Sequence, residues 1–136
     1  MIRYFRTDDI IYIEQIGHQI DDKFKLKIND YSRCIVYEKD NMIVGFIVFS
    51  MIYETAEIID MAVMKEYQGQ GIGSQLFVFA NNECINNGCG VIMLEVRSGN
   101  KKAISFYKKN GFKKVIVRRG YYRDGEDAFV MEKLVV

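Results

Sequence analysis

The sequence contains no proline, no tryptophan and a single histidine, His18. Without proline the usual sharp breakers are missing, so glycines and capping residues must separate the helices and strands. The three cysteines, Cys34, Cys84 and Cys89, are odd in number and include no C-x-x-C pair, which argues against a disulfide framework and against a zinc site. We therefore expect reduced thiols that are buried or half-buried, and no metal.

Long apolar runs are also missing. No run approaches the roughly 18 to 20 residues of a membrane-spanning helix, and charges stand too early at the amino end for the apolar core of a signal peptide. We expect a cytoplasmic protein with no membrane partner, as a monomer or a weak dimer. The 136 residues suit a single domain, 1–136, that is large enough to bury a core.

Neither sign of charge dominates, since the net charge is +1, and nothing indicates nucleic acid as a partner. The distribution is nevertheless uneven. Ten Lys or Arg and no acidic residue lie from Arg97 to Arg123, whereas Met1 to Glu66 holds twelve acidic and eight basic residues. The basic segment suits a polyanionic cofactor, or it forms solvated faces of a helix and a strand.

Apolar periodicity predicts the order of strands and helices. A helix capped by Thr7 follows the first strand, and the less regular segment Asp22–Tyr31 is interpreted as a second short helix. The run G-V-I-M-L-E-V-R is typical of a strand buried on both faces. The expected strands are Ile2–Phe5, Cys34–Glu38, Met42–Tyr53, Glu57–Met64, Gly90–Arg97, Phe112–Arg119 and Ala128–Val135, and the expected helices are Asp8–Ile20, Ser74–Asn87 and Asn100–Lys109. This order predicts an α/β (α+β) fold, with a mixed sheet and helices on both of its faces.

A glycine-rich loop stands between the strand at 57–64 and the helix that follows it. Three alternate glycines at such a junction let the backbone approach a ligand closely and direct several N–H groups at it. The positive end of the helix dipole adds to the attraction for anions. The pattern predicts a phosphate-binding loop formed by Gln68, Gly69, Gln70, Gly71, Ile72, Gly73 and Ser74.

Two other phosphate-binding loops fit these residues poorly. A P-loop needs Lys and then Ser or Thr after its last glycine, where this chain has Ser74 and Gln75. A Rossmann loop needs a glycine where Ser74 stands. The remaining alternative is a flexible turn without a ligand.

The run Q-G-Q-G-I-G, residues 68–73, resembles the Q/R-x-x-G-x-G/A acetyl-CoA signature of the GNAT acetyltransferases. The resemblance implies a GNAT fold, whose central, mostly antiparallel sheet is splayed between the fourth and fifth strands. It implies that residues 69–74, next to Gln68 of the same signature, bind the pyrophosphate of acetyl-CoA. It also implies that the backbone of Met61, Ala62 and Val63 pairs with the pantetheine arm, as an added strand would.

The stretch Leu94–Phe112, L-E-V-R-S-G-N-K-K-A-I-S-F-Y-K-K-N-G-F, resembles the GNAT subgroup that acetylates protein N-termini, especially the RimI-type ribosomal-protein alanine acetyltransferases. The resemblance implies Glu95 as general base, Tyr107 as general acid and Asn100 as a contact to the cofactor arm. Acetyl transfer needs such a proton acceptor for the amine and a proton donor for the departing thiolate. Plainer interpretations exist: Glu95 paired with Arg97 or a lysine, Tyr107 as core packing, and Asn100 as a helix cap.

The run R-R-G-Y-Y-R-D-G-E-D-A-F-V-M, residues 118–131, resembles the tail of protein N-terminal acetyltransferases, where a hairpin covers the peptide entry. The resemblance implies that Tyr121 and Tyr122 hold the first backbone groups of the substrate. Alternatively, they are a cross-strand aromatic pair. The tryptophan common near the first helices of that subgroup is absent, and Phe24 stands in this region as a candidate wall residue of the peptide slot.

Together with the resemblance, these residues predict an acetyl-CoA-dependent N-acetyltransferase that works by direct transfer in a ternary complex. The expected acceptor is the N-terminal α-amine of a protein, such as a small-subunit ribosomal protein. An α-amine, with a pKa of about 7.7 to 8.0 against about 10.4 for lysine, demands little of its base. Two alternatives stay open: a small-molecule amine or lysine side chain as acceptor, and an acyl-CoA-binding module without catalysis.

Overall fold

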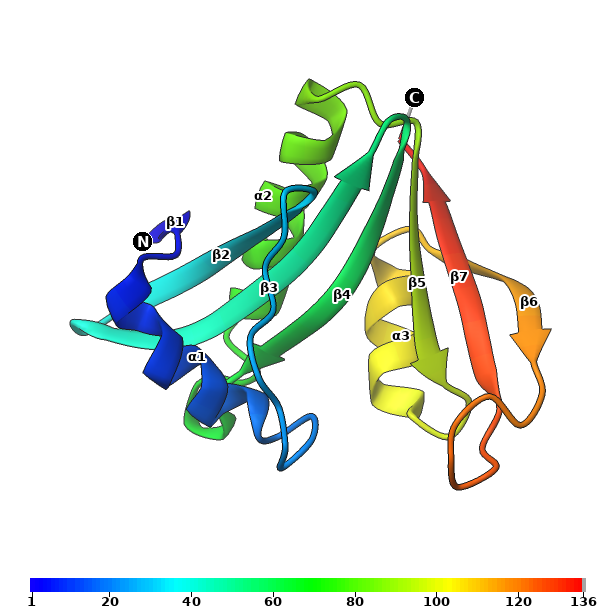
Figure 1. Ribbon diagram of the computed structural model, residues 1–136, viewed down its shortest axis with the longest axis horizontal. Coiled ribbons are helices and arrows are strands. Elements are labelled where there is room, and N and C mark those ends of the chain that lie inside the picture. Colours follow the sequence, from blue (N-terminus) through cyan, green and yellow to red (C-terminus); the bar gives the residue numbers. More distant parts are fainter. Residues whose placement is uncertain (136) are drawn as a thin grey trace.

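The computed structural model describes residues 1–135 and shows one seven-stranded mixed sheet (Figure 1). The strands follow the order β1-β2-β3-β4-β5-β7-β6, and all neighbours are antiparallel except the parallel pair β4–β5. Their bounds are β1 Ile2–Tyr4, β2 Ser32–Lys39, β3 Met42–Ile52, β4 Thr55–Val63, β5 Val91–Arg97, β6 Lys113–Arg118 and β7 Ala128–Leu134.

Helices cover both faces of the sheet, as the sequence predicts. Helix α1 packs on β3 and β4 on one face, whereas α2 packs on β2, β3 and β4 on the other. Helix α3 shares the core of α2 and lies behind β5 in Figure 1. The helical segments are α1 Ile10–Gly17, α2 Ile72–Asn86 and α3 Lys101–Lys109, with 3-10 turns η1 Thr7–Asp9 and η2 Lys65–Tyr67. The mixed, mostly antiparallel fold is thereby confirmed.

Two cores lie on opposite faces of the sheet because side chains alternate along each strand. In β2, Cys34 and Val36 point toward α1, whereas Ile35 points toward α2. The α1-side core is formed by Ile13, Ile16, Phe24, Cys34, Val36, Ile43, Phe46 and Val48. The α2-side core is larger and includes Ile35, Ile47, Phe49, Ile58, Leu76, Phe77, Cys84, Cys89, Leu94, Phe112 and Met131. The three cysteines are free and buried, as expected.

The sheet is splayed between β4 and β5. The two strands pair only through Thr55–Val91, Ala56–Ile92 and Glu57–Met93. Beyond Glu57 they diverge, as Figure 1 shows from their shared upper end downward. The second half of β4 therefore pairs with β3 on one side and leaves its other edge open. This geometry confirms the splay that the resemblance implies.

Strand β5 corrects one expectation, since it is not buried on both faces. Ile92, Leu94 and Val96 are buried, while the alternate residues Met93 and Glu95 are only half-buried. Helix α1 packs on β3 and β4. The side chains of Met93 and Glu95 consequently remain partly accessible on the α1-side face of β5.

The expected second helix at Asp22–Tyr31 is wrong, because the chain there forms turns and irregular structure. Only Phe24 and Leu26 reach the α1-side core, and a spacing of two residues suits an extended chain and not a helix. The carboxylate of Glu14 accepts a hydrogen bond from the Leu26 N–H at 3.0 Å and fixes the segment against α1.

Thr7 does not cap the first helical segment, which is a second correction. It is the first residue of η1, and the Arg6 N–H instead donates to the carboxylate of Asp9 at 2.7 Å. The same carboxylate forms two hydrogen bonds with Arg3 of β1, at 2.8 and 3.1 Å. Asp9 is therefore a buried ion-pair partner that ties β1 to the start of α1.

Within residues 1–135, no helix combines the length and the apolar character needed to cross a lipid bilayer.

Candidate active site

The glycine loop leads from η2 at the end of β4 into helix α2. Gly69 and Gly71 have φ values of +81° and +82°, which are left-handed conformations that favour glycine. Gly71 is the N-cap of α2, and the side chain of Ile72, the first residue of the helix, is buried in the core and anchors the loop there. The helix thus begins at Ile72, two residues earlier than the sequence predicts.

The amide groups of this loop are free. The first intrahelical bond of α2 runs from the Gln75 N–H to the Gly71 carbonyl at 3.0 Å. Within the described part of the chain, the N–H groups of Gly69 to Ser74 donate to no backbone acceptor. Six consecutive donors at the positive end of a fifteen-residue helix form an arrangement that binds phosphate.

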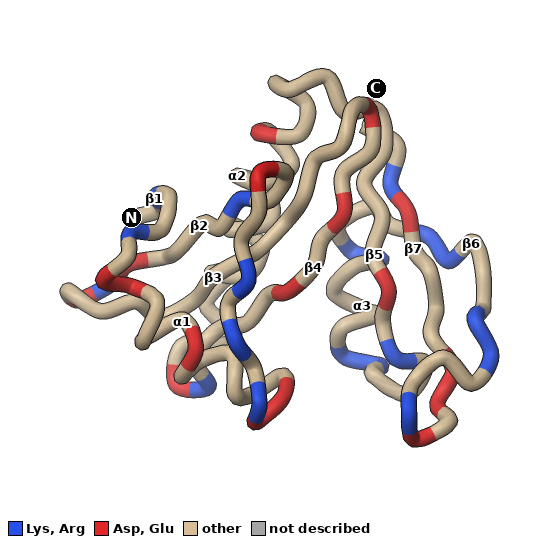
Figure 2. The backbone as a smooth tube through the Cα atoms, in the orientation of Figure 1, with Lys and Arg blue, Asp and Glu red and all other residues tan. Residues whose placement is uncertain are grey.

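Side chains connect the loop to its neighbours. Gln68 donates from Nε2 to the Val63 carbonyl at 2.9 Å and accepts from Lys102 Nζ at 3.0 Å. Lys39 Nζ donates to Gln70 Oε1 at 2.9 Å. These contacts hold the loop between β4 and α3 and bring two cations close to it. Figure 2 shows basic residues gathered on α3 and β6.

The predicted pantetheine-binding segment lies on the open edge of β4. Met61, Ala62 and Val63 are half-buried and pair with β3 on their other side, Ala62 with Phe46. Their other edge has no strand partner and faces the splay that separates β4 from β5, where the Val63 carbonyl accepts from the side chains of Gln68 and Gln19. An extended ligand arm can therefore add to this edge as a strand would.

Asn100 is the N-cap of α3. Its side-chain oxygen accepts a hydrogen bond from the Ala103 N–H at 3.2 Å, and the residue is exposed. The helix-cap interpretation is thereby confirmed.

Glu95 faces a small cavity at the narrow end of the splay. Its carboxylate accepts from Arg118 Nε at 2.9 Å and from the Tyr121 hydroxyl at 3.3 Å. The cavity has a volume of about 240 Å³ and is also lined by Glu57 and Met93. Glu95 therefore connects β5 to β6 and to the loop that follows β6.

Arg97 is not the partner of Glu95, although the two stand on the same face of β5. Arg97 Nη1 instead donates to Asp124 at 3.0 Å and to Glu126 at 2.9 Å. A second carboxylate, Glu57, borders Glu95. Burial raises the pKa of Glu57, and the negative charge of Glu95 raises it further.

Tyr107 lies on α3 in the α2-side core. Its ring packs edge-on against Phe106 and Phe112, with centroid distances of 5.5 and 5.7 Å. Burial raises its pKa to about 12, with a further contribution from the negative charge of Asp60. The phenol consequently keeps its proton at neutral pH.

Tyr121 and Tyr122 are adjacent in the loop between β6 and β7. Their rings form an edge-to-face pair with centroids 5.1 Å apart, and the Arg97 guanidinium lies 4.0 Å from the Tyr122 ring. The Gly99 N–H donates to Glu126 at 2.7 Å, which fastens the loop to the end of β5. The pair belongs to this loop, so it is not cross-strand.

Phe24 lies apart from these residues. It is only 8% exposed, packs on Phe46 with a centroid distance of 5.6 Å and contacts Gly17 so closely that a Cβ there would overlap its ring. Its ring fills the α1-side core and does not form an open wall.

Sequence reasoning missed two site residues. Arg118, the partner of Glu95, opens the R-x-x-Y-Y run, but its spacing from Glu95 carries no signal of a contact. Asp60 stands on β4 immediately before Met61, and nothing in the alternation of that strand singles it out.

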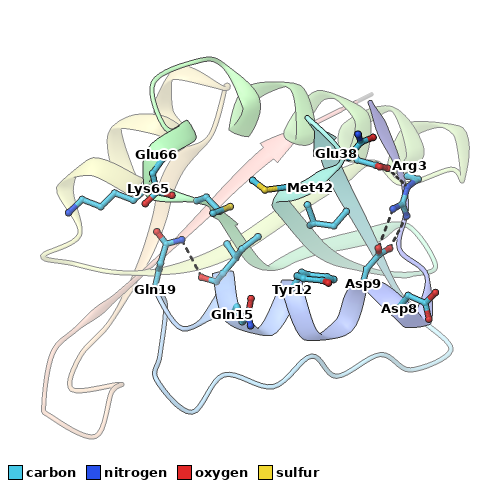
Figure 3. Close-up of a pocket in the computed structure, with 14 residues that line it drawn as sticks. Arg3, Asp8, Asp9, Tyr12, Gln15, Gln19, Glu38, Met42, Lys65 and Glu66 are labelled. Atoms are coloured by element: carbon cyan, nitrogen blue, oxygen red, sulfur yellow. Dashed lines mark hydrogen bonds and ion pairs between the residues drawn. The ribbon is translucent and has the colours of Figure 1, made fainter.

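A cavity of about 670 Å³ lies elsewhere, between α1, β1 and the β2–β3 turn (Figure 3). There Arg3 binds both Asp9 and Glu38. None of the predicted site residues lines it. Among residues 1–135, no group of three or more His, Cys, Asp or Glu is placed to hold a metal ion.

Comparison with known proteins links these features to a family. Residues 2–112 match the model of the Acetyltransferase (GNAT) family. A Bacillus subtilis protein, provisionally named ribosomal protein bS18-alanine N-acetyltransferase, is 33% identical over 139 residues, which cover 96% of this chain and 92% of the relative. The crystal structure of the ribosomal-protein-S18-alanine N-acetyltransferase from Escherichia coli has a TM-score of 0.85 at 27% identity and covers 99% of this chain and 93% of that one.

A more distant structure shares the fold alone. The aminoglycoside 6'-N-acetyltransferase complexed with coenzyme A has a TM-score of 0.85 at 15% identity, covering 100% of this chain and 97% of that one. Equal TM-scores for acceptors as different as a protein and an antibiotic show that the backbone alone does not define the acceptor.

Proposed function

The chain belongs to the GNAT acetyltransferase family, and we propose that it acetylates the N-terminal α-amine of a protein. It is an acetyl-CoA-dependent acyltransferase. We treat residues 1–136 as one acetyltransferase domain, which the continuous sheet from Ile2 to Leu134 supports.

Acetyl-CoA is the co-substrate. The six free amides of Gly69 to Ser74 are suited to its pyrophosphate, with Gln68 and Lys102 at the side of the loop. The open edge of Met61 to Val63 is suited to its pantetheine arm. In this proposal Asn100 reaches the arm while capping α3. The thioester then lies inside the splay between β4 and β5.

The chemistry we propose uses Glu95 and Tyr107. The acceptor amine must lose a proton before it attacks the thioester carbonyl, and Glu95 removes that proton through a water molecule. Arg118 fixes the Glu95 carboxylate in position through a charge-assisted hydrogen bond. The thiol of coenzyme A has a pKa of about 8.5. It is more acidic than the phenol of Tyr107, whose pKa burial raises to about 12, so the thiolate does not remove the phenol proton outright. Tyr107 therefore stabilises the departing sulfur by donating a hydrogen bond, and passes a proton on only as the amine releases one.

The choice of a protein N-terminus rests on one observation: the Tyr121 hydroxyl binds the same Glu95 carboxylate that serves the reacting amine. A peptide whose first backbone groups contact Tyr121 and Tyr122 would present its α-amine directly to Glu95. The relatives named for ribosomal protein S18 favour a small-subunit ribosomal protein beginning with alanine as the natural acceptor.

The remaining partner assignments are part of the same proposal. The protein acts as a monomer or a weak dimer, without nucleic acid or a membrane as partner. A cytoplasmic location agrees with its three free, buried cysteines.

The test is acetyl transfer from acetyl-CoA to a panel of acceptors: peptides with free N-termini, N-terminally blocked peptides with an internal lysine, polyamines and aminoglycosides. We expect turnover of free N-terminal peptides and none of blocked peptides. Turnover restricted to polyamines, aminoglycosides or lysine would disprove the proposed acceptor. Binding of acetyl-CoA without turnover of any amine would instead favour a non-catalytic acyl-CoA-binding module.

A further inference from the structure

A β-bulge in β4 determines where the side chain of Asp60 points. Asp60 pairs with Val48 and Ile58 pairs with Phe49, which leaves Ile59 as an extra residue. In a regular strand Glu57 and Asp60 would face opposite sides of the sheet. The bulge brings both to the α1-side face, since Val48 belongs to the α1-side core and Ile58 to the α2-side core.

The carboxylate of Asp60 is half-buried and has no cationic partner. Burial raises its pKa to about 6. Within residues 1–135 it forms no ion pair, whereas Glu95 binds Arg118 and Glu14 binds Lys25 and the Leu26 N–H. A half-buried carboxylate is costly unless something pairs with it, which suits a group that receives a ligand.

The neighbours of Asp60 locate it beside the proposed thioester. It directly precedes the open edge of Met61 to Val63. Burial is the largest cause of the raised pKa values of Tyr107 on α3 and Cys34 on β2. The negative charge of Asp60 contributes to both, after that of Asp9 in the case of Cys34. On the same face, the ionisable groups of the two neighbouring strand segments are Glu57 on β4 and Glu95 and Arg97 on β5, where Arg97 is paired with Asp124 and Glu126. Glu14, the acidic residue of α1, is paired with Lys25.

We propose that Asp60 receives the positively charged amino group of the acceptor and holds it beside the thioester. This inference rests on the proposed function and extends it, because it makes a protonated amine the form that binds. The bound ammonium then loses one proton through a water molecule to Glu95, and its nitrogen forms a bond to the carbonyl carbon. The C–S bond breaks, and the thiolate receives the second nitrogen proton with Tyr107 as hydrogen-bond donor.

The experiment measures kcat/KM for a peptide with a free N-terminus between pH 5 and 9 at saturating acetyl-CoA. This quantity reports ionisations of the free enzyme and the free peptide. The wild type should lose activity below a midpoint of about 6, the pKa of Asp60. For Asp60→Asn, kcat/KM should show no midpoint near pH 6. It should rise instead as the peptide amine is deprotonated, at about pH 8. We also expect the KM for peptide at pH 7 to increase about tenfold, with the KM for acetyl-CoA unchanged.

Asp40→Asn is the matched control. Asp40 lies in the exposed β2–β3 turn with φ +54°, a conformation that asparagine also adopts. This variant also replaces a carboxylate by an amide, and it should keep the wild-type pH dependence of kcat/KM. If Asp60→Asn fails to fold, Asp60→Ser serves as a second variant that also removes the carboxylate charge.

An Asp60→Asn profile and peptide KM equal to those of the wild type would overturn the inference while leaving the proposed function intact. If the wild type itself acetylates no peptide, the proposed function fails and a direct titration still tests Asp60. In carbon-13 NMR, the carboxyl resonance of Asp60 should titrate at a lower pH when a C-terminally amidated peptide with an N-terminal alanine is added to the enzyme in the presence of coenzyme A. An unchanged midpoint would count against Asp60 as the ammonium-binding residue.

Discussion

At the scale of single residues, the carboxylates fall into two groups. Asp9 and Glu95 are each held by an arginine, whereas the half-buried Asp60 and the exposed Glu57 have no cationic partner within residues 1–135. The hydrogen bond from Arg3 is the largest cause of the lowered pKa of Asp9, while burial raises that of Asp60 to about 6. The paired carboxylates organise the fold and the site, and the unpaired ones remain free to meet an incoming cation.

Removing the hydroxyl of Tyr107 should affect catalysis and leave the fold intact. Tyr107→Phe retains the ring that packs on Phe106 and Phe112 but loses the hydrogen bond to the departing sulfur. We expect kcat to fall about a hundredfold, with the KM for acetyl-CoA unchanged. Steady-state kinetics would measure both values. Tyr53→Phe, at a residue that is 94% exposed, is the control, and a Tyr107→Phe enzyme as active as this control would exclude the proposed role.

Removing the Asp9 carboxylate should destabilise the protein. Asp9→Ala leaves Arg3, whose side chain is 15% exposed, without its main partner and deprives the Arg6 N–H of its acceptor. Breaking a buried pair of this kind costs about 3 kcal/mol in the free energy of unfolding. Urea denaturation at pH 7 would measure the loss. The neighbouring exposed variant Asp8→Ala should change stability by less than about 0.5 kcal/mol.

The pH dependence of this pair has a definite sign. The folded-state pKa of Asp9 lies below its ordinary value of 3.8, so its stabilisation is present at neutral pH and is lost as the pH falls through the folded-state pKa. The difference in the free energy of unfolding between wild type and Asp9→Ala, measured by urea denaturation, should therefore become smaller below about pH 4. A difference that stays constant down to pH 2 would mean that the carboxylate charge is not the cause.

At the scale of elements, the glycine loop combines two local requirements, left-handed backbone at Gly69 and Gly71 and free amides before α2. Neither depends on a distant contact, because both follow from glycine spacing and from where a helix begins. Contacts from Lys102 and Lys39 then fix the position of the loop relative to α3 and β2.

A methyl group at Gly71 should weaken acetyl-CoA binding. An alanine at position 71 must leave the φ of +82° or bear about 1 kcal/mol of strain. A shift of this residue would reorient the free N–H groups of the glycine loop. We expect at least tenfold weaker binding in isothermal titration calorimetry. Gly88→Ala has the same type of strain, at φ +84°, but lies beyond the other end of α2. Equal affinities for the two variants would contradict the phosphate-binding role of the loop.

At the scale of the whole molecule, the splay divides the sheet into two parts. One part holds β1 to β4 with α1 and α2, and the other holds β5 to β7 with α3. Three residue pairs join β4 to β5, and Gln68 and Lys102 form a further link across the opening. A ligand between the parts would contact the loop on one side and α3 on the other.

Acetyl-CoA should therefore stabilise the complete fold. At a concentration one hundred times its Kd, a ligand that binds only the folded state contributes about 2.7 kcal/mol. For a domain of this size we expect Tm to rise by on the order of 5 to 10 °C, as measured by differential scanning calorimetry. Adenosine without the diphosphate and pantetheine arm serves as the control. No rise in Tm with acetyl-CoA would argue against ligand binding in the splay.

Much of this protein could be predicted from local sequence. The spacing of glycines at 69, 71 and 73 predicted a loop with free amides at the start of α2, because left-handed backbone and free helix-terminal amides are local properties. Apolar periodicity predicted the strands and the three α-helices, since both are read over a few residues. The resemblance carried by Leu94–Phe112 predicted the family and its reaction, which the comparisons confirm.

Only the tertiary structure decided which side chains meet. Glu95 binds Arg118 and not Arg97, because β6 and β7 bring Arg118 across the sheet. The bulge at Ile59 turns Asp60 toward the α1-side face, against the simple alternation of a strand. Packing against Phe46 buries Phe24, which the sequence suggested as a wall residue of the peptide slot. Register, bulges and packing depend on residues far apart in the chain, so no local pattern contains them.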